Sequence, residues 1–271
     1  MADLSRDRRP RVGVDGVGLL ATAAMNEFFI GLHQPSDARH VPSAFISVHR
    51  LRPRKAPMQV RRWILDSGAF TTLQLRGGYP HSPQEYAAEI RRWRDNGTLL
   101  AAVAQDFMCE PFMLARTGLS IADHQRLTIE RYDELVGCDV AGAYIMPVLQ
   151  GYSPDDYCRH LDQYGDRLGP AAWVGVGSVC KRNSSPSAVE DVLIAIKHAR
   201  PDLRLHGFGI KTTALASGLA RSLLHSADSM AWSYAARRQK RRQNDYREAL
   251  AFAHRIATIP VQESLLAQLA L

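Results

Sequence analysis

Apolar runs of four to seven residues, rich in β-branched and aromatic side chains, alternate along this chain with longer amphipathic segments. Such runs predict strands, here at 28–33, 44–49, 63–66, 100–105, 143–149, 173–177, 203–208 and 226–232. Between most of them, helical spacing of apolar residues or an N-cap signal predicts helices over 86–96, 120–136, 153–164 and 187–200. Strands separated by helices indicate a parallel sheet with helical crossovers.

Polar residues stand at or just beyond the carboxyl end of the predicted strands, among them Asp66, Asp106, Gln150, Ser178, His206 and Asp228. In a (β/α)8 barrel those ends form one rim, where catalytic groups lie. We therefore predict an α/β fold, a single TIM-type barrel domain over residues 1–271, with a doubly wound sheet as the alternative. The chain after Asn244 is expected to form a closing helix, with a buried side made by Leu250, Phe252, Ile256, Leu265 and Leu269.

The composition is that of a globular protein with a basic surface. Of 271 residues, 46% are hydrophobic and 23% charged, and the net charge is +7. Basic residues gather near the N-terminus, at 50–55, and most densely at Arg237, Arg238, Lys240, Arg241 and Arg242. Such a cluster is either a solvated helix face or a surface that binds nucleic-acid phosphates.

The spacing of the cysteines and the length of the apolar runs indicate the cellular compartment. The four cysteines, Cys109, Cys138, Cys158 and Cys180, form no CxxC pair, which favours a reducing compartment and argues against a structural zinc site. The apolar stretch 12–24 is interrupted by Asp15 and several glycines. No run reaches the roughly 18 apolar residues of a membrane span. We expect a cytoplasmic protein without membrane association, metal or cofactor.

Two of the rim residues, Asp66 and Asp228, stand where an apolar strand gives way to a turn of small residues. An aspartate in such a place often serves as a helix N-cap or turn former. Two carboxyl groups on one rim also suit chemistry at a glycosidic carbon. Exchanging one base for another at C1′ with retained configuration needs a carboxylate nucleophile and a second carboxyl group that moves the proton.

Six rim segments share an order and spacing with a known superfamily. They are 65–70, which reads Leu-Asp-Ser-Gly-Ala-Phe, and 104–111, 147–151, 174–178, 205–209 and 227–229. Together they resemble the tRNA-guanine transglycosylases, and more closely the DpdA-type branch, which inserts 7-deazaguanines into DNA. The resemblance extends from about residue 28 to about residue 242.

The resemblance implies a role for each carboxylate of the rim. Asp228 matches the nucleophile that attacks C1′ and displaces guanine, and Asp66 matches the aspartate that handles protons as bases leave and enter. Asp106 and Gln150, with Gly151 beside it, match residues that bind the purine edge. A carboxylate accepts well from the N1–H and 2-amino groups of guanine, and an amide suits the 6-oxo edge.

The resemblance also places residues around the base. Gly177 and Ser178 match a backbone pair that lies against it, where the family more often has two glycines, and His206 and Gly209 match a loop flanking the pocket. Simpler interpretations exist for single residues: His206 as a hydrogen-bonded core histidine, and Asp106 as a strand-end cap.

The chain departs from the tRNA-acting members of the superfamily, which carry a CxCxxC…His zinc site after the nucleophile. Here no cysteine follows Cys180. We therefore predict exchange of guanine in DNA, single-stranded or flipped out, for a 7-deazaguanine such as the 7-cyano form. The resemblance makes an ATP-using helper protein a candidate partner. The alternatives are the same exchange on tRNA or a free nucleoside, or a nucleic-acid-binding barrel without catalysis.

Overall fold

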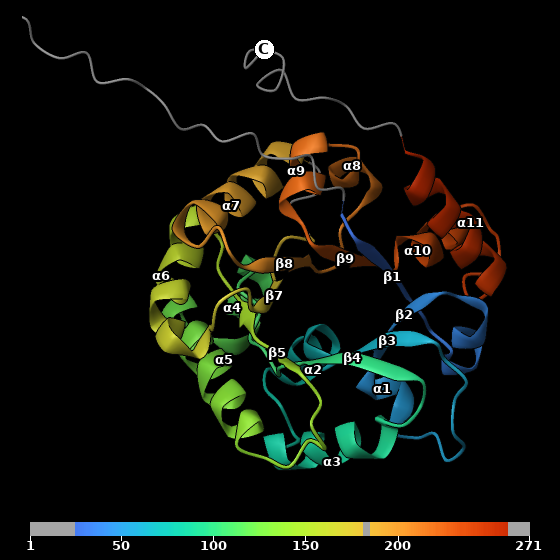
Figure 1. Cartoon of the computed structure of the whole chain (residues 1–271), viewed down its shortest axis with the longest axis horizontal. Coiled ribbons are helices and arrows are strands. Elements are labelled where there is room, and N and C mark those ends of the chain that lie inside the picture. The colour runs from blue at the N-terminus through green and yellow to red at the C-terminus, as the bar shows by residue number, and fades with distance from the viewer. Residues whose placement is uncertain (1–24, 181–184, 260–271) are drawn as a thin grey trace, which may run out of the picture.

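The strands form a ring with helices around it, as the computed structural model shows for residues 25–180 and 185–259 (Figure 1). The strands are β1 (Glu27–Gly31), β2 (Ser43–Ser47), β3 (Arg62–Asp66), β4 (Thr98–Val103), β5 (Ile145–Met146), β6 (Val148–Leu149), β7 (Trp173–Val176), β8 (Arg204–Gly207) and β9 (Ser226–Ser229). They pair in the order β5-β4-β3-β2-β1-β9-β8-β7-β6, and every pairing is parallel.

The two ends of this strand order meet at Pro147. That residue separates β5 from β6, which are consecutive in the chain and occupy one position of the barrel. A proline has no N–H to donate to a ladder, so the predicted run 143–149 is divided there. The Pro147 carbonyl still accepts a hydrogen bond from Gly175 N, at 2.8 Å. The predicted TIM-type barrel is thereby confirmed.

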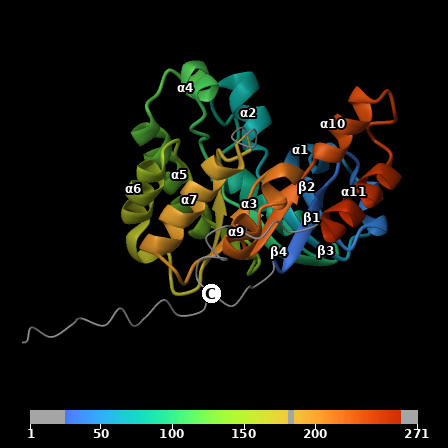
Figure 2. The same ribbon diagram turned by 90° about the horizontal axis from the view of Figure 1, so that it is seen from above.

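Helices cover the outside of the barrel. They are α1 (Val48–Leu51), α2 (Ala69–Arg76), α3 (Pro83–Trp93), α4 (Pro111–Thr117), α5 (Ile121–Val136), α6 (Pro154–Tyr164), α7 (Pro186–Ala199), α8 (Thr212–Leu215), α9 (Gly218–Leu223), α10 (Ala231–Arg238) and α11 (Tyr246–Thr258), with 3-10 turns at Pro35–His40 and Gly165–Arg167. Figure 2 shows α2, α4 and α10 projecting from one end of the barrel. Each of them begins after a strand or its loop, so this is the carboxyl end of the sheet.

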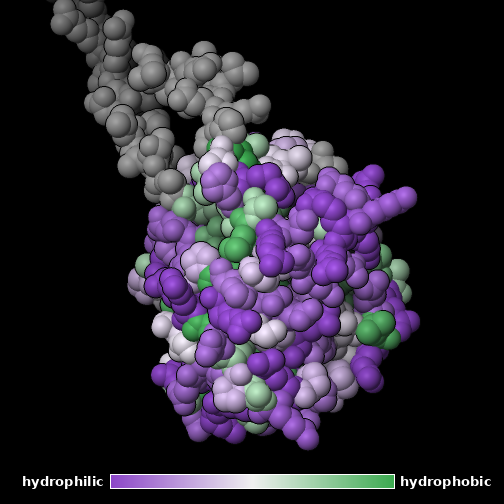
Figure 3. All heavy atoms as spheres, turned by 90° about the vertical axis from the view of Figure 1, so that its right-hand side faces the viewer, coloured by the Kyte–Doolittle hydropathy of each residue, from purple (hydrophilic) through white to green (hydrophobic). Residues whose placement is uncertain are grey.

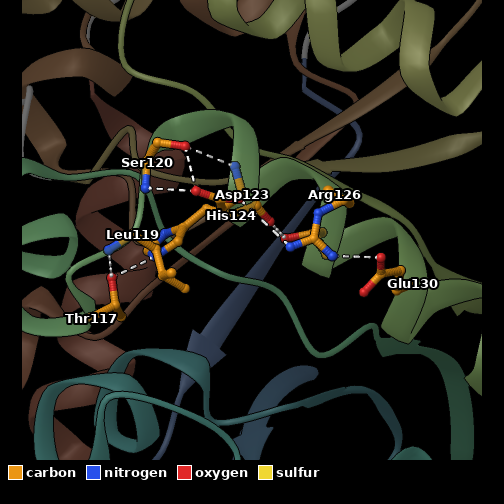
Figure 4. A network of polar contacts seen from close by, with 8 residues as sticks. Thr117, Leu119, Ser120, Asp123, His124, Arg126 and Glu130 are labelled. Atoms are coloured by element: carbon orange, nitrogen blue, oxygen red, sulfur yellow. Dashed lines mark hydrogen bonds and ion pairs between the residues drawn. The ribbon is translucent and has the colours of Figure 1, made fainter.

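The predicted helices are confirmed, and local capping explains where three of them begin. Ser82, Ser120 and Ser153 each form a capping box with the acidic residue three positions later. At α5, Ser120 Oγ accepts from Asp123 N while the Asp123 carboxylate accepts from Ser120 N (Figure 4). His124 then bonds the Met108 carbonyl at 2.7 Å, which ties this helix to the loop after β4.

Several predicted strands are too long at their carboxyl ends, and two of them extend into a helix. The run 44–49 ends at Ser47, where α1 begins, and the run 226–232 ends at Ser229, followed by α10. Trp232 is apolar and buried because it packs from α10 onto the barrel, where its indole N–H donates to the Gly31 carbonyl at 2.8 Å. Local hydropathy does not separate such a residue from the strand before it.

Helix α11 confirms part of the predicted closing helix. Phe252 and Ile256 are buried, Leu250 is partly buried, and the Phe252 ring lies 6.1 Å from that of Phe28. Leu265, Leu269, the N-terminal arginines and the apolar stretch 12–24 lie outside the described residues. Within residues 25–180 and 185–259, no helix is long and apolar enough to cross a bilayer.

Candidate active site

The carboxyl ends of the strands bring the predicted site residues to one rim. Asp66 is the last residue of β3, and Asp228 lies in β9, at the same end of the sheet. Asp106, Gln150 and Ser178 each follow a strand by one to three residues. Side chains packed inside the barrel, including Phe29, Ile64, Val103, Met146 and Trp173, fill the space beneath them. The rim is thus the accessible end of a closed core.

Asp228 is held by one of its two oxygens. Its Oδ1 accepts from the Gly209 N–H at 3.0 Å and lies 3.3 Å from His206 Nε2. Both bonds involve Oδ1, and no hydrogen bond from a described residue reaches Oδ2. Oδ2 can therefore contact a reacting atom. Asp228 is buried, with only 6% of the residue exposed. This arrangement suits a nucleophile with a fixed orientation.

His206 lies beneath this carboxylate, inside strand β8, and not in a flanking loop as the resemblance implied. Trp173 Nε1 donates to Ser226 Oγ at 2.9 Å, and Ser226 Oγ lies 2.9 Å from His206 Nδ1. Because an indole can only donate, the Ser226 hydroxyl hydrogen is available to His206 Nδ1. In that tautomer Nε2 carries the proton and donates to Asp228.

Asp66 has the properties of a proton carrier. Burial, with a smaller contribution from the charge of Asp228, raises the pKa of its carboxyl to about 6, against bonds from the Gly68 N–H and Ser47 that lower it. Both protonation states are therefore populated near neutral pH. The influence of Asp228 also shows that the two carboxyl groups lie close enough to interact.

The turn after Asp66 requires glycine. Gly68 has φ +75°, and a Cβ there would lie 2.4 Å from the His49 ring. His49 in turn bonds the Gly68 carbonyl at 3.1 Å and Thr72 Oγ1 at 2.8 Å. The glycine of the Asp-Ser-Gly sequence is thus explained, because Gly68 has a left-handed backbone and lies directly against the His49 ring.

Asp106, Gln150 and Ser178 form a buried polar network. The Gln150 amide nitrogen donates to Asp106 Oδ2, and its Oε1 lies 2.7 Å from Ser178 Oγ. Burial raises the pKa of Asp106 to about 7, with smaller increases from the charges of Asp66 and Glu110 and a decrease from the Gln150 bond. Gly177 leaves room for this amide, since a Cβ there would lie 2.1 Å from Gln150 Nε2.

Ser178 connects that network to Glu110, a residue to which the sequence analysis assigned no role. It adopts φ +54°, and its hydroxyl lies 2.8 Å from both Glu110 Oε2 and Cys109 N. Glu110 is 1% exposed and belongs to the same buried network. Two acidic residues four positions apart after one strand, Asp106 and Glu110, are the sequence signal that points to it. Tyr79 is a second such residue, with its hydroxyl on the Asp106 carbonyl at 2.8 Å.

A further shell of bonds fixes Gln150. Its N–H donates to His160 Nδ1 at 2.8 Å, and its carbonyl accepts from Gln125 Nε2 at 2.8 Å. Gly151 allows helix α6 to approach, because a Cβ there would lie 2.6 Å from Asp156 Cβ. Gly151 therefore lies directly against α6.

The predicted basic cluster ends α10 and continues into the next turn. Arg237, Arg238, Lys240, Arg241 and Arg242 are all exposed. Arg241 forms an ion pair with Glu248, whereas the Arg237 guanidinium lies over the Tyr234 ring, 5.3 Å from its centroid. The face that carries α10 and α11 is largely hydrophilic (Figure 3). Within the described parts of the chain, no three His, Cys, Asp or Glu side chains are grouped to hold a metal ion.

Comparison with protein families agrees with this geometry. Residues 24–245 match the family model DpdA, described as DeoxyPurine in DNA protein A. The chain belongs to this family. Its members are the DpdA-type 7-deazaguanine DNA transglycosylases, so the resemblance drawn from the rim motifs is confirmed and the protein is a transglycosylase of the DNA-modifying kind. The match includes every site residue named above. A comparison with curated proteins gave no match.

Proposed function

We propose that this protein replaces guanine in DNA with a 7-deazaguanine through a covalent intermediate on Asp228. The observation that supports this best is the interaction of Asp66 with Asp228 on one rim, with the pKa of Asp66 raised to about 6. A nucleophilic carboxylate beside a carboxyl group that titrates near neutrality is the pair that a double displacement at an anomeric carbon needs.

In the first half-reaction, Asp228 Oδ2 forms a bond to C1′ as the bond from C1′ to N9 of guanine breaks. Asp66 in its protonated form gives its proton to the leaving base, so guanine departs neutral. His206 and the Gly209 N–H hold Oδ1 throughout, which keeps Oδ2 directed at the sugar. The products are a glycosyl ester on Asp228, an ionised Asp66 and free guanine.

In the second half-reaction, the incoming 7-deazaguanine loses its N9 proton to Asp66 as N9 bonds to C1′ and the ester breaks. Two inversions retain the configuration at C1′. Asp106 and Gln150 bind both purines by their shared edge, which is why one pocket serves the leaving and the entering base. The Asp66 proton is restored, and no net proton is consumed.

The nucleophile assignment has a direct test. Native protein incubated with a guanine-containing oligonucleotide should yield a covalent protein–DNA adduct that survives denaturation, and Asp228→Ala should yield none and exchange no labelled guanine. The loss in exchange rate should exceed about 1,000-fold, because both displacements need the carboxylate. Full exchange activity in Asp228→Ala would overturn the assignment.

The substrate is tested by offering labelled guanine with DNA, tRNA and deoxyguanosine in parallel. Family membership favours exchange into DNA alone. Addition of ATP and of proteins encoded beside this one tests whether a helper is required. Incorporation into tRNA or the nucleoside, and not into DNA, would replace the proposed substrate while leaving the chemistry in place.

A further inference from the structure

A polar cleft of about 510 Å³ lies between α1 and α10. Its walls include His33 just after β1, Arg50 of α1, and Ser233 and Arg237 of α10. Amide side chains, Tyr234 and Met230 complete the lining, which contains no aspartate or glutamate among the described residues. With two guanidinium groups and no carboxylate, the cleft is suited to an anion.

The two arginines of the cleft are not among those that pair with a carboxylate in the described chain. Within the described residues eight arginines form ion pairs with a carboxylate, namely Arg62, Arg92, Arg126, Arg159, Arg167, Arg200, Arg241 and Arg247. Across residues 25–180 and 185–259, neither Arg50 nor Arg237 has such a partner. Their charges are therefore not neutralised within this part of the protein, and they face a shared space.

A chain of hydrogen bonds adds a further donor. An Arg50 N–H lies 3.3 Å from His33 Nδ1, and His33 Nε2 lies 2.7 Å from Ser233 Oγ. Because arginine can only donate, His33 accepts at Nδ1 and donates from Nε2 to Ser233. Burial and the Arg50 charge lower the pKa of His33, consistent with this neutral form. The Ser233 hydroxyl hydrogen then remains for a ligand in the cleft.

The cleft is fixed close to the nucleophile. Met230 lines it and follows Asp228 by two residues, a span of at most about 7 Å of extended chain. Trp232 anchors α10 to the barrel through its bond to the Gly31 carbonyl at 2.8 Å. Tyr234, 56% exposed, presents a ring at the edge of the cleft, with Arg237 over it. An exposed aromatic ring beside arginines is a stacking surface for an unpaired base.

We propose that this cleft binds the phosphodiester group next to the target nucleotide, through Arg50, Arg237 and the Ser233 hydroxyl, while Tyr234 stacks on a neighbouring base. The inference rests on the proposed function, since it takes the ligand to be a DNA strand. It assigns the anchoring of that strand to residues on both sides of the cleft, one of which, Arg50, lies far in sequence from the basic cluster after Asp228.

Binding is measured by fluorescence anisotropy in the Asp228→Ala protein, so that no adduct forms, with a single-stranded oligonucleotide containing one guanine. Adding Arg50→Gln or Arg237→Gln should each weaken binding about tenfold and reduce the salt dependence by about one phosphate contact. Arg126→Gln removes the same charge from a remote ion pair on α5 and serves as the matched control. Cleft variants that bind as tightly as this control would overturn the proposal.

A neutral methylphosphonate placed at one linkage at a time locates the contact. Neutralising one particular linkage beside the guanine should weaken binding of the Asp228→Ala protein about tenfold. The same replacement should have little effect on binding of the protein that carries both Asp228→Ala and Arg50→Gln. Equal losses in both proteins at every linkage would show that Arg50 binds none of them.

The two hypotheses fail separately. If Arg50 and one linkage are coupled in binding but the native protein exchanges no base, the cleft is supported and the proposed function is overturned. If exchange occurs and no linkage is coupled to Arg50 or Arg237, the proposed function stands and the cleft does not.

Discussion

At the scale of single residues, burial and neighbouring charge give the rim carboxylates different roles. Asp228 is oriented through Oδ1, whereas the pKa of Asp66 is raised to about 6 and that of Asp106 to about 7. All three are aspartates at strand ends, so their sequence contexts alone do not rank them. The difference comes from what surrounds each side chain once the barrel closes.

The pKa of Asp66 predicts opposite pH profiles for the two half-reactions. Guanine release needs protonated Asp66. The single-turnover rate constant of guanine release should therefore fall as pH rises through about 6. Entry of the new base needs ionised Asp66, so its rate on a preformed adduct should rise over the same range. Rapid-quench measurements from pH 5 to 8 test this. Asp66→Asn should lose both inflections, and profiles unchanged by that substitution would exclude Asp66 as the proton carrier.

Ser178 offers a test of the pocket network without loss of fold. Ser178→Gly relieves a left-handed backbone at φ +54° but removes the hydroxyl between Glu110 and Gln150. Stability should stay within about 1 kcal/mol of the native protein. The KM for the incoming base should rise about three- to tenfold, because Gln150 loses one of the bonds that orient it. Exchange kinetics and thermal unfolding measure the two effects.

Ala171→Gly is the matched control for that variant. Ala171 also has φ +54°, and it precedes β7, at the end of the barrel opposite the rim. It should show the same backbone relief with an unchanged KM. A KM that stays unchanged in Ser178→Gly as well would remove the Ser178 hydroxyl from base recognition.

At the scale of elements, helices that follow strands hold the rim in place. The bond from Trp232 to Gly31 joins the start of α10 to β1, and the bond from His124 to Met108 joins α5 to the loop carrying Asp106. Both contacts join a helix to a segment at the carboxyl end of the barrel. The site is therefore built on packed elements, which limits the movement of its side chains.

Replacing Trp232 by Phe should destabilise the protein by about 1–3 kcal/mol in urea unfolding, because the buried Gly31 carbonyl loses its donor. Trp93→Phe is the control: Trp93 is equally buried, but its indole donates to Glu89, which is partly exposed and contacts Arg92. Its loss should be smaller, because water can replace that donor. Equal losses in the two variants would show that the bond to Gly31 contributes nothing of its own.

At the scale of the whole molecule, the site lowers stability at neutral pH. A carboxyl group whose pKa is raised on folding binds more protons in the native state than in the unfolded state. The stability it contributes therefore falls as pH rises from about 4 to about 6 for Asp66 and to about 7 for Asp106. Such a loss is expected where function requires charges in a covered pocket.

Asp66→Asn and Asp106→Asn should each change the free energy of unfolding in a pH-dependent way. Relative to the native protein, each variant should be more stable above pH 7 than at pH 4 by about 1–3 kcal/mol. An asparagine oxygen can still accept the bonds from Ser47 and Gln150. Urea unfolding of native and variant proteins across pH 4 to 8 measures the difference. A constant difference over this range would contradict the raised pKa values.

Local patterns in the sequence were sufficient to predict the parallel α/β barrel, the helices α3, α5, α6, α7 and α11, and the position of the rim carboxylates at strand ends. These features depend on local signals: apolar runs, capping boxes such as Ser120 with Asp123, and the glycine turn after Asp66. The order of the rim motifs added the family, which comparison confirmed over residues 24–245.

Which of these residues contact one another became clear from the folded barrel. Closure of the sheet brings Glu110 to Ser178, 68 positions apart, and Arg50 to the cleft beside α10. It also buries His206 under Asp228, so that a residue expected to flank the base orients the nucleophile instead. Contacts of this kind depend on strand order and helix packing, which no local pattern of side chains encodes.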